Sequence, residues 1–354
     1  MTTPDVEAVT AAVWSGGADV DVRRLPVPQL AAGEMLVRIE LATVCGSDRH
    51  TVAGRRHSPA PGILGHEGVG RVAALGAGGA VDVDGRTLSV GDRIVWSVVS
   101  ACGTCDRCRA DHTAKCRSLR KVGHEPLDSP WPLSGTYATH LLLPAGHAVV
   151  RVPDPVPDAS ASIAGCALAT VFACVEAAGP LHGRAVLVSG LGTLGACAVA
   201  VAAAHGAAVI VGVDPDPERR GVARDLGAAL VRRPGPPLAD EPEPDVVLEL
   251  SGAADAVAAA VERVGVGGRV VLAGSVAPSG TVAVDPERLV RNLTTLVGVH
   301  NYEPRHLRSA VEFLESGSGD AMAGLVDAPV GLHDLGAVLR PEPGTTGRAS
   351  VAPG

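Results

Sequence analysis

The chain has 354 residues, 46% of them hydrophobic, which is enough for two domains that each bury a core. Its 30 basic and 38 acidic residues give a formal net charge of −8, and no run of like charges stands out. This excludes a general basic surface for nucleic acid, so we expect a small-molecule partner. Aromatic residues make up only 2%, which favours a core of small aliphatic side chains, as in parallel strands buried between helices.

No targeting or membrane segment is expected. The N-terminus lacks a basic start followed by an apolar run, so we predict no signal peptide. The longest apolar run, 196–213, is interrupted by His205 and Gly206, and its halves are typical of a helix followed by a strand. A cytoplasmic, reducing location follows, and there clustered cysteines favour metal over disulfides.

The first 152 residues contain short valine-rich runs, such as 34–44 and 91–99, which predict strands of a mostly antiparallel domain. Three prolines within 152–161 then predict a hinge. We expect three segments: a first domain (1–152), a second domain (153–301) and a C-terminal return to the first domain (302–354). The last segment holds one amphipathic helix, at 304–317, and is too small to fold alone.

Strands and helices alternate from residue 184 onward. Strands are expected at 184–190, 207–214, 244–252 and 268–275, and helices at 193–206, 217–227 and through 264. Asp216 stands where a helix N-cap is needed. This α/β alternation predicts a doubly wound parallel sheet.

A dinucleotide fingerprint follows the first of these strands. Gly190, Gly192 and Gly195 form G-x-G-x-x-G around Thr193 and Leu194, which open the next helix. Asp214 ends the following strand, where it is expected to bind the adenosine ribose and repel a 2′-phosphate, favouring NAD over NADP. Arg219 and Arg220 lie just beyond and weaken that preference. A glycine turn without a ligand is the alternative.

Four cysteines in one loop predict a structural zinc site. The spacing C-x2-C-x2-C-x7-C supplies four thiolates and leaves no coordination position for substrate. A disulfide pair and an iron–sulfur cluster are the alternatives. A reducing compartment disfavours disulfides, and the lack of a nearby Cys-Pro run disfavours an iron–sulfur cluster. The four ligands are Cys102, Cys105, Cys108 and Cys116.

A sparser set suggests a second, catalytic zinc. Cys45, His66 and Glu67 offer a thiolate, an imidazole and a carboxylate, and Cys166, expected at a helix N-terminus that lowers its pKa, offers another thiolate. Taken singly, each cysteine or histidine is equally typical of an ordinary core position.

These motifs, in this order, resemble the zinc-dependent alcohol dehydrogenases of the medium-chain dehydrogenase/reductase superfamily. The resemblance rests on "CGSDRH", "GHEGVGRV", "GDRI", the four-cysteine lobe, "GTYATH", "GLGTLG" and Asp214. It implies a mostly antiparallel, GroES-like catalytic domain, a Rossmann domain that binds NAD(H), and an active site in the cleft between them.

The resemblance also implies roles for single residues. Cys45, His66 and Cys166 would bind the catalytic zinc, and Glu67 would stand beside it or exchange as a ligand. Ser47 would take the alcohol proton and His50 would relay it to solvent. Arg348, near the chain end, would reach the cofactor phosphates.

A narrower likeness is to phosphonate-associated alcohol dehydrogenases, carried by "CGSDRHTVAGRR", "KVGHEPLDSPWPLSGTYATH" and "LTTLVGVHNYEPRHL". It implies an anionic substrate, such as 2-hydroxyethylphosphonate with phosphonoacetaldehyde. Cations near the motifs would bind it, although paired arginines are equally typical of a solvated loop. They are Arg49, Arg55, Arg56, Lys121 and His124.

Two other functions remain open. One is a zinc-free enone or quinone reductase of the same superfamily, and the other is a non-catalytic dinucleotide-binding protein. A homodimer or homotetramer is expected, with the strand-like 292–300 extending a sheet across a two-fold axis.

Overall fold

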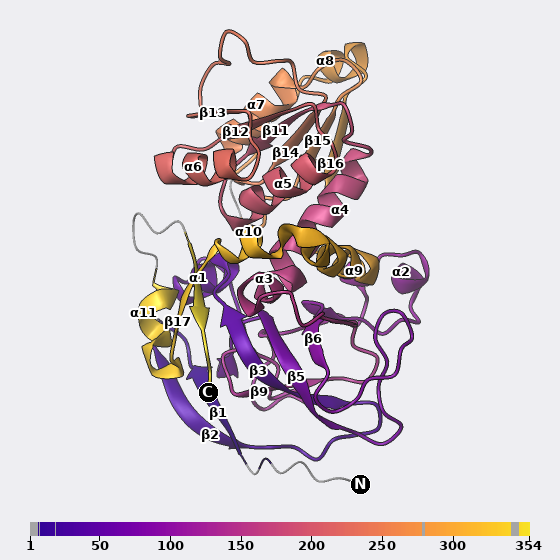
Figure 1. Ribbon diagram of the computed structural model, residues 1–354, viewed down its shortest axis with the longest axis vertical. Helices are drawn as coiled ribbons and strands as arrows, with labels where there is room; N and C mark the ends of the chain where they lie inside the picture. Colours follow the sequence, from indigo (N-terminus) through magenta and orange to yellow (C-terminus); the bar gives the residue numbers. More distant parts are fainter. Residues whose placement is uncertain (1–5, 7, 18, 278–279, 341–346) are drawn as a thin grey trace. The chain divides into compact units, whose positions relative to one another are not determined.

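The computed structural model describes the chain except residues 1–5, 7, 18, 278–279 and 341–346 (Figure 1). Contacts divide it into two compact units, Met1–Ala169 with Glu303–Gly354, and Thr170–Tyr302. The C-terminal segment therefore belongs to the first unit, as its size led us to expect. The first division falls after Ala169 rather than after the hinge at 152, because the helical residues 158–168 pack on strands of the first unit.

The first unit, which we call the catalytic unit, is built on a seven-stranded sheet in the order β10-β6-β5-β3-β18-β17, with β9 also on β3. All neighbours are antiparallel except β17 with β18, which confirms the mostly antiparallel expectation. The strands are β3 (Met35–Thr43), β5 (Glu67–Leu75), β6 (Arg93–Trp96), β9 (His140–Leu143), β10 (Val149–Arg151), β17 (Val326–Val330) and β18 (Arg348–Val351).

Smaller elements surround this sheet. A three-stranded sheet has the order β2-β1-β4, and a two-stranded one joins β7 to β8. The strands are β1 (Ala8–Trp14), β2 (Val20–Pro26), β4 (Gly62–Ile63), β7 (Val99–Ser100) and β8 (Arg120–Lys121). The helices are α1 (Gly46–Val52), α2 (Asp106–Arg109), α3 (Asp158–Ser162), α9 (Pro304–Phe313), α10 (Gly319–Ala323) and α11 (Leu335–Leu339).

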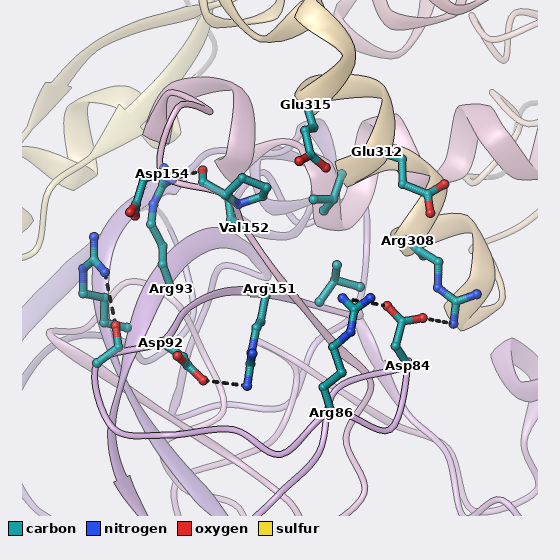
Figure 2. A pocket seen from close by; sticks show the side chains of 15 residues that line it. Asp84, Arg86, Asp92, Arg93, Arg151, Val152, Asp154, Arg308, Glu312 and Glu315 are labelled. Atoms are coloured by element: carbon teal, nitrogen blue, oxygen red, sulfur yellow. Dashed lines mark hydrogen bonds and ion pairs between the residues drawn. The ribbon is translucent and has the colours of Figure 1, made fainter.

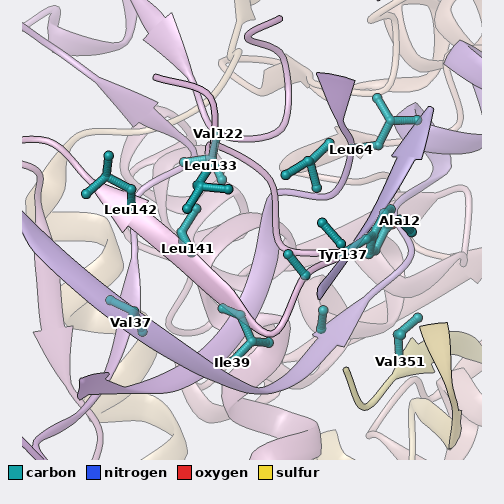
Figure 3. Close-up of a cluster of buried hydrophobic side chains, with 14 of the residues drawn as sticks. Ala12, Val37, Ile39, Leu64, Val122, Leu133, Tyr137, Leu141, Leu142 and Val351 are labelled. Atoms are coloured by element: carbon teal, nitrogen blue, oxygen red, sulfur yellow. The ribbon is translucent and has the colours of Figure 1, made fainter. Parts of the chain in front are cut away.

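The catalytic core lies against β3. Ile39 on β3, Leu141 on β9 and Val351 on β18 are all at most 1% exposed and belong to one apolar cluster (Figure 3). Tyr137, fully buried in the same cluster, directs its hydroxyl to the Asp48 carboxylate at 2.9 Å. The core thus extends directly into the polar residues described below.

The second unit, which we call the nucleotide unit, contains a six-stranded, all-parallel sheet in the order β13-β12-β11-β14-β15-β16. The chain order reverses between β11 and β14, as in doubly wound dinucleotide-binding folds. The strands are β11 (Ala185–Ser189), β12 (Val209–Val213), β13 (Leu230–Arg232), β14 (Val246–Glu249), β15 (Arg269–Leu272) and β16 (Thr295–Gly298). The helices are α4 (Ala169–Ala178), α5 (Thr193–Ala204), α6 (Pro217–Asp225), α7 (Ala254–Arg263) and α8 (Pro286–Arg291).

Two local predictions are confirmed in the nucleotide unit. Asp216 caps α6, accepting hydrogen bonds from the backbone N–H groups of Glu218 (2.8 Å) and Arg219 (3.4 Å). The apolar run 196–213 is shared between α5 and β12. Among the described residues, the structure has no helix with the length and apolar character needed to cross a membrane.

Candidate active site and metal centres

The sparse ligand set converges in the catalytic unit. Ligand atoms of Cys45, His66, Glu67 and Cys166 all lie within 4.8 Å of one another. Cys45 caps α1 directly after β3, His66 and Glu67 lie where β5 begins, and Cys166 lies in a π-helical segment, Ala164–Leu168. Two sulfurs, an imidazole and an adjacent carboxylate are the donors that zinc prefers. The residues present therefore fit a zinc ion.

The two sulfurs of this cluster compete for one proton. A hydrogen bond from Cys166 lowers the pKa of Cys45 well below its ordinary value, with Arg348 and His66 adding to the effect. The same bond, together with burial, raises the pKa of Cys166. Cys166 was expected at or just before a helix N-terminus that lowers its pKa. It lies inside a π-helical turn, and its pKa is raised instead, first by the hydrogen bond with Cys45 and then by burial. Such turns are common at functional sites.

Asp48 orients the histidine of the cluster. Its Oδ1 lies 3.5 Å from His66 Nδ1, and its Oδ2 accepts from the Cys45 backbone N–H (3.0 Å) and the Tyr137 hydroxyl (2.9 Å). A carboxylate on one ring nitrogen leaves the other directed at a metal. Sequence reasoning missed Asp48, although an acid three residues after a helix cap is a recognisable capping signal.

Glu67 is held by a cation from the chain end. Its side chain is fully buried, and Arg348 Nη1 contacts both of its carboxylate oxygens. The Thr43 hydroxyl donates to Oε2 at 2.8 Å, and Arg348 Nη2 lies 3.9 Å from Cys45 Sγ. Burial raises the pKa of Glu67, and Arg348 opposes the rise. The expected contact of Arg348 with cofactor phosphates is thus replaced by a contact inside the metal cluster.

The two relay candidates follow Cys45 on α1. Ser47 and His50 are three residues apart, so they lie on the same side of that helix, and both are half-buried. Burial lowers the pKa of His50, and Arg55 lowers it further, which favours the neutral ring. Its Nδ1 is buried without a hydrogen-bond partner among the described residues. A neutral imidazole is able to accept a proton.

The four-cysteine loop forms a second cluster, in which the four sulfur atoms lie within 4.8 Å of one another. Cys105 Sγ is 3.5 Å from Cys108 Sγ and 4.0 Å from Cys116 Sγ. The backbone N–H of Thr104, first among several donors, lowers the pKa of Cys102 to about 6, which favours the thiolate. His112 is exposed. The donor set fits a closed tetrahedral zinc.

A cavity of about 870 Å³ lies in the nucleotide unit at the glycine fingerprint. Gly190, Gly192, Asp214 and Arg219 line it, whereas Gly195 is buried against the Gly190 carbonyl. Both Asp214 carboxylate oxygens already accept backbone N–H groups, from Leu191 (2.8 Å) and Asp216 (2.9 Å).

Two fingerprint residues, Thr193 and Leu194, open α5 and are not among the cavity's described lining residues. At its N-terminus α5 presents backbone N–H groups, an arrangement suited to a pyrophosphate.

A second cavity, of about 590 Å³, lies in the catalytic unit between loops of the large sheet and α9. Figure 2 shows its charges facing one another: Arg308 and Arg86 meet Asp84, and Arg151 meets Asp92. With its arginines in ion pairs, this cavity resembles a solvated ionic surface.

The fold and sites define a dehydrogenase. Residues 31–154 match the alcohol dehydrogenase GroES-like domain and residues 193–316 match the zinc-binding dehydrogenase domain. The chain belongs to the zinc-binding alcohol dehydrogenases of the medium-chain dehydrogenase/reductase superfamily.

Known relatives share most of their length with the chain. It is 33% identical to 5-exo-hydroxycamphor dehydrogenase of Pseudomonas putida, covering 85% of this chain and 86% of that one. It is 30% identical to L-threonine 3-dehydrogenase of Mesorhizobium japonicum, covering 89% of each. Among solved structures, an alcohol dehydrogenase of Thermotoga maritima superposes with a TM-score of 0.91 at 25% identity, covering 98% of this chain and 100% of that one.

Proposed function

We propose that this dehydrogenase interconverts an alcohol and an aldehyde or ketone by hydride transfer with NAD(H). The observation that carries the proposal is the convergence of Cys45, His66 and Cys166, with Glu67 beside them, on one point of the catalytic unit. A neighbouring helix supplies Ser47 and His50. The nucleotide unit supplies a cavity at the glycine fingerprint.

In the proposed reaction, Cys45, His66 and Cys166 would hold a zinc ion, and its Lewis acidity would lower the pKa of the alcohol hydroxyl. The Ser47 hydroxyl would accept that proton while it gives its own proton to the relay, and His50 would pass a proton on to solvent. The carbon–hydrogen bond breaks with its electron pair, which leaves as hydride to NAD+, and a carbonyl remains. Asp214 and Arg219 would hold the adenosine ribose of NAD(H), and the N-terminus of α5 would hold its pyrophosphate. Asp48 and Arg348 keep His66 and Glu67 in place.

For the substrate, we propose an alcohol that carries a phosphonate, such as 2-hydroxyethylphosphonate, oxidised to phosphonoacetaldehyde. Support comes from cations near the cluster. Burial lowers the pKa of Lys121, and repulsion by the Arg56 charge lowers it further. Among the described residues, neither Lys121 nor Arg56 forms an ion pair with an acidic side chain. The His124 ring lies 5.9 Å from that of His66, but burial lowers its pKa to about 4, so it would offer a hydrogen bond to the substrate and not a charge. A substrate panel comparing hydroxyalkylphosphonates with plain alcohols tests this, and equal kcat/KM on both would refute it.

The metal assignment is tested by Cys45→Ser, with Cys174→Ala as the control, because Cys174 is a buried cysteine outside both clusters. We expect Cys45→Ser to lose turnover while it still binds NADH, and to lose one of two zinc ions per chain. Retained turnover would refute the mechanism. Wild-type protein that binds no zinc would favour the enone or quinone reductase. Two filled zinc sites without NAD(H) turnover on any alcohol or aldehyde would favour the non-catalytic protein.

We also propose a homo-oligomer in the cytoplasm. β16 is an edge strand, and Val290, Leu293 and Leu296 beside or on it are 74%, 71% and 39% exposed. Such an apolar edge favours pairing with a second copy. Light scattering during gel filtration should give a dimer or tetramer, and Leu296→Lys should shift it toward the monomer.

A further inference from the structure

Two arginines form the far wall of the nucleotide cavity. Arg232 ends β13, Arg263 ends α7, and both line the cavity together with Asp214. Arg232 is also the backbone neighbour of Asp214, because its carbonyl accepts the Asp214 N–H at 3.1 Å. The adenosine ribose that Asp214 is proposed to bind therefore lies next to this wall.

One carboxylate, Glu241, holds both arginines. Its side chain is fully buried, and the side chains of Arg232 and Arg263 are only 8% and 18% exposed. Arg232 donates to it through Nε (2.6 Å) and Nη2 (3.2 Å), and Arg263 Nη2 makes a close ion pair with its Oε1. The backbone N–H of Leu238 adds a fourth hydrogen bond, at 3.0 Å.

Most of the guanidinium donors are therefore occupied, although both groups line a ligand cavity. Arg232 also donates through Nη1 to two backbone carbonyls, those of Arg233 and Gly235. Arg263 Nη1 is buried without a hydrogen-bond partner among the described residues. Glu241 neutralises one of the two positive charges and occupies donors of both arginines, so fewer guanidinium donors are left for a second anion.

We propose that Glu241 is a specificity-determining residue that makes this enzyme prefer NAD(H) to NADP(H). A ribose 2′-phosphate is a dianion, and it needs bidentate guanidinium contacts to enter a site that already contains the Asp214 carboxylate. Arg232 and Arg263 line the same cavity as Asp214, and Glu241 holds donors of both guanidinium groups that such a phosphate would need. The inference rests on the proposed function only in assigning this cavity to a dinucleotide.

The test is Glu241→Gln, which preserves size and removes the charge. Binding of NADPH and NADH to the zinc-loaded protein is measured by nucleotide fluorescence, so turnover is not needed. We expect the Kd for NADPH to fall about tenfold and that for NADH to change less than about twofold. The control is Glu243→Gln, an exposed acid in the same loop, which should leave both constants unchanged.

A second variant shows that the arginines carry the effect. Glu241→Gln combined with Arg263→Met should lose most of the gain in NADPH affinity. If Glu241→Gln does not fold, Glu241→Asp takes its place, since a shorter carboxylate cannot reach both arginines equally. A folded Glu241 variant whose NADPH-to-NADH ratio equals that of the wild type would overturn the inference. Wild-type protein that binds neither nucleotide would instead refute the proposed function on which it rests.

Discussion

Arg348 and Glu67 are 281 residues apart in the chain, and the guanidinium of one contacts both carboxylate oxygens of the other. The contact is fixed by backbone pairing: β18 pairs with β3, and Glu67 begins β5 on the other side of β3. Three strands from three parts of the sequence therefore bring the acid, the base and the Thr43 hydroxyl together. Arg348, near the end of the chain, thus supplies the counter-charge for Glu67 beside the proposed zinc ligands.

Arg348→Met should destabilise the protein strongly, because it leaves the Glu67 carboxylate buried without a cation. The expected loss is about 3–5 kcal/mol in the free energy of unfolding, measured with urea. Arg340→Met is the control: its ion pair with Asp19 is exposed, so we expect a loss of at most about 1 kcal/mol. Equal losses in the two variants would contradict this account of the buried pair.

Glu303→Ala should loosen the four-cysteine loop. Glu303 Oε2 accepts hydrogen bonds from the Thr113 backbone N–H (3.0 Å) and hydroxyl (2.5 Å), and Oε1 from the Ala114 N–H (3.4 Å), just before the ligand Cys116. We expect zinc to leave this loop at least about tenfold faster, read with a colorimetric chelator, since hydrogen bonds to a carboxylate contribute about 1.5–3 kcal/mol each.

The other metal site provides the comparison for Glu303→Ala, because its zinc should leave at the wild-type rate. Glu312→Ala, an exposed acid on α9, serves as the control variant. Release from both sites at an equally increased rate would point to general unfolding instead.

Gly190→Ala should abolish nucleotide binding. Gly190 has φ +88°, and a Cβ there would lie 2.6 Å from the Ser251 backbone nitrogen. The turn that opens the cavity must therefore move, at a cost of about 1–3 kcal/mol from backbone strain alone. NADH binding by fluorescence should fall more than about tenfold while both zinc ions stay bound. Gly221→Ala, on α6 with open space around it, should bind NADH normally.

The free energy of unfolding should rise with pH between about 4 and 6.5, in part because of His147. This ring is buried, donates from Nε2 to the Ser97 carbonyl at 2.8 Å, and has its pKa lowered to about 4 by that burial. The unfolded chain binds a proton below about pH 6.5 and the folded chain does not, so acid favours unfolding. From about pH 6.5 down to 4, roughly 3 kcal/mol is lost.

His147→Phe should reduce this slope, measured by urea unfolding at several pH values, and exposed His333→Gln should not. His124, whose burial also lowers its pKa to about 4, contributes a similar slope, so only the difference from wild type isolates His147. An unchanged slope in His147→Phe would contradict its neutral state in the fold.

The fold and the main ligands followed from local patterns. The glycine fingerprint, the strand–helix alternation and the spacing of the four-cysteine loop each reflect short-range backbone or ligand geometry, so the parallel sheet and that loop could be predicted. The set Cys45, His66 and Cys166 spans most of the first unit, and its grouping was expected from the family resemblance. Arg348 and Asp48 could not be placed in the same way. The contact of Arg348 depends on the pairing of β18 with β3, which are far apart in the sequence. The contacts of Asp48 depend on its capping position on α1 and on the Tyr137 hydroxyl that donates to it.

Two errors have a common physical cause. The hinge prolines suggested that the catalytic unit ends at 152, and Cys166 was expected to begin a helix. In the structure, residues 158–168 form helical turns that pack on β3 and β5, so they belong to the catalytic unit and carry Cys166 within a π-helical turn. Proline spacing marks where the backbone bends, whereas domain membership depends on which surface the next segment buries.

The arrangement of β18 also sets an order for biosynthesis. The nucleotide unit is one continuous segment, 170–302, so it has all its strands once that stretch has left the ribosome. The catalytic unit must wait for residues 303–354, because its sheet lacks two neighbouring strands and Glu67 lacks its counter-charge until then. Since domains fold as units during synthesis, the inserted unit is expected to fold first, while its host is still an open sheet. A ribosome stalled before residue 348 would then carry a finished nucleotide unit and an exposed edge of β3, which is the point at which a nascent chain of this protein is most prone to aggregate.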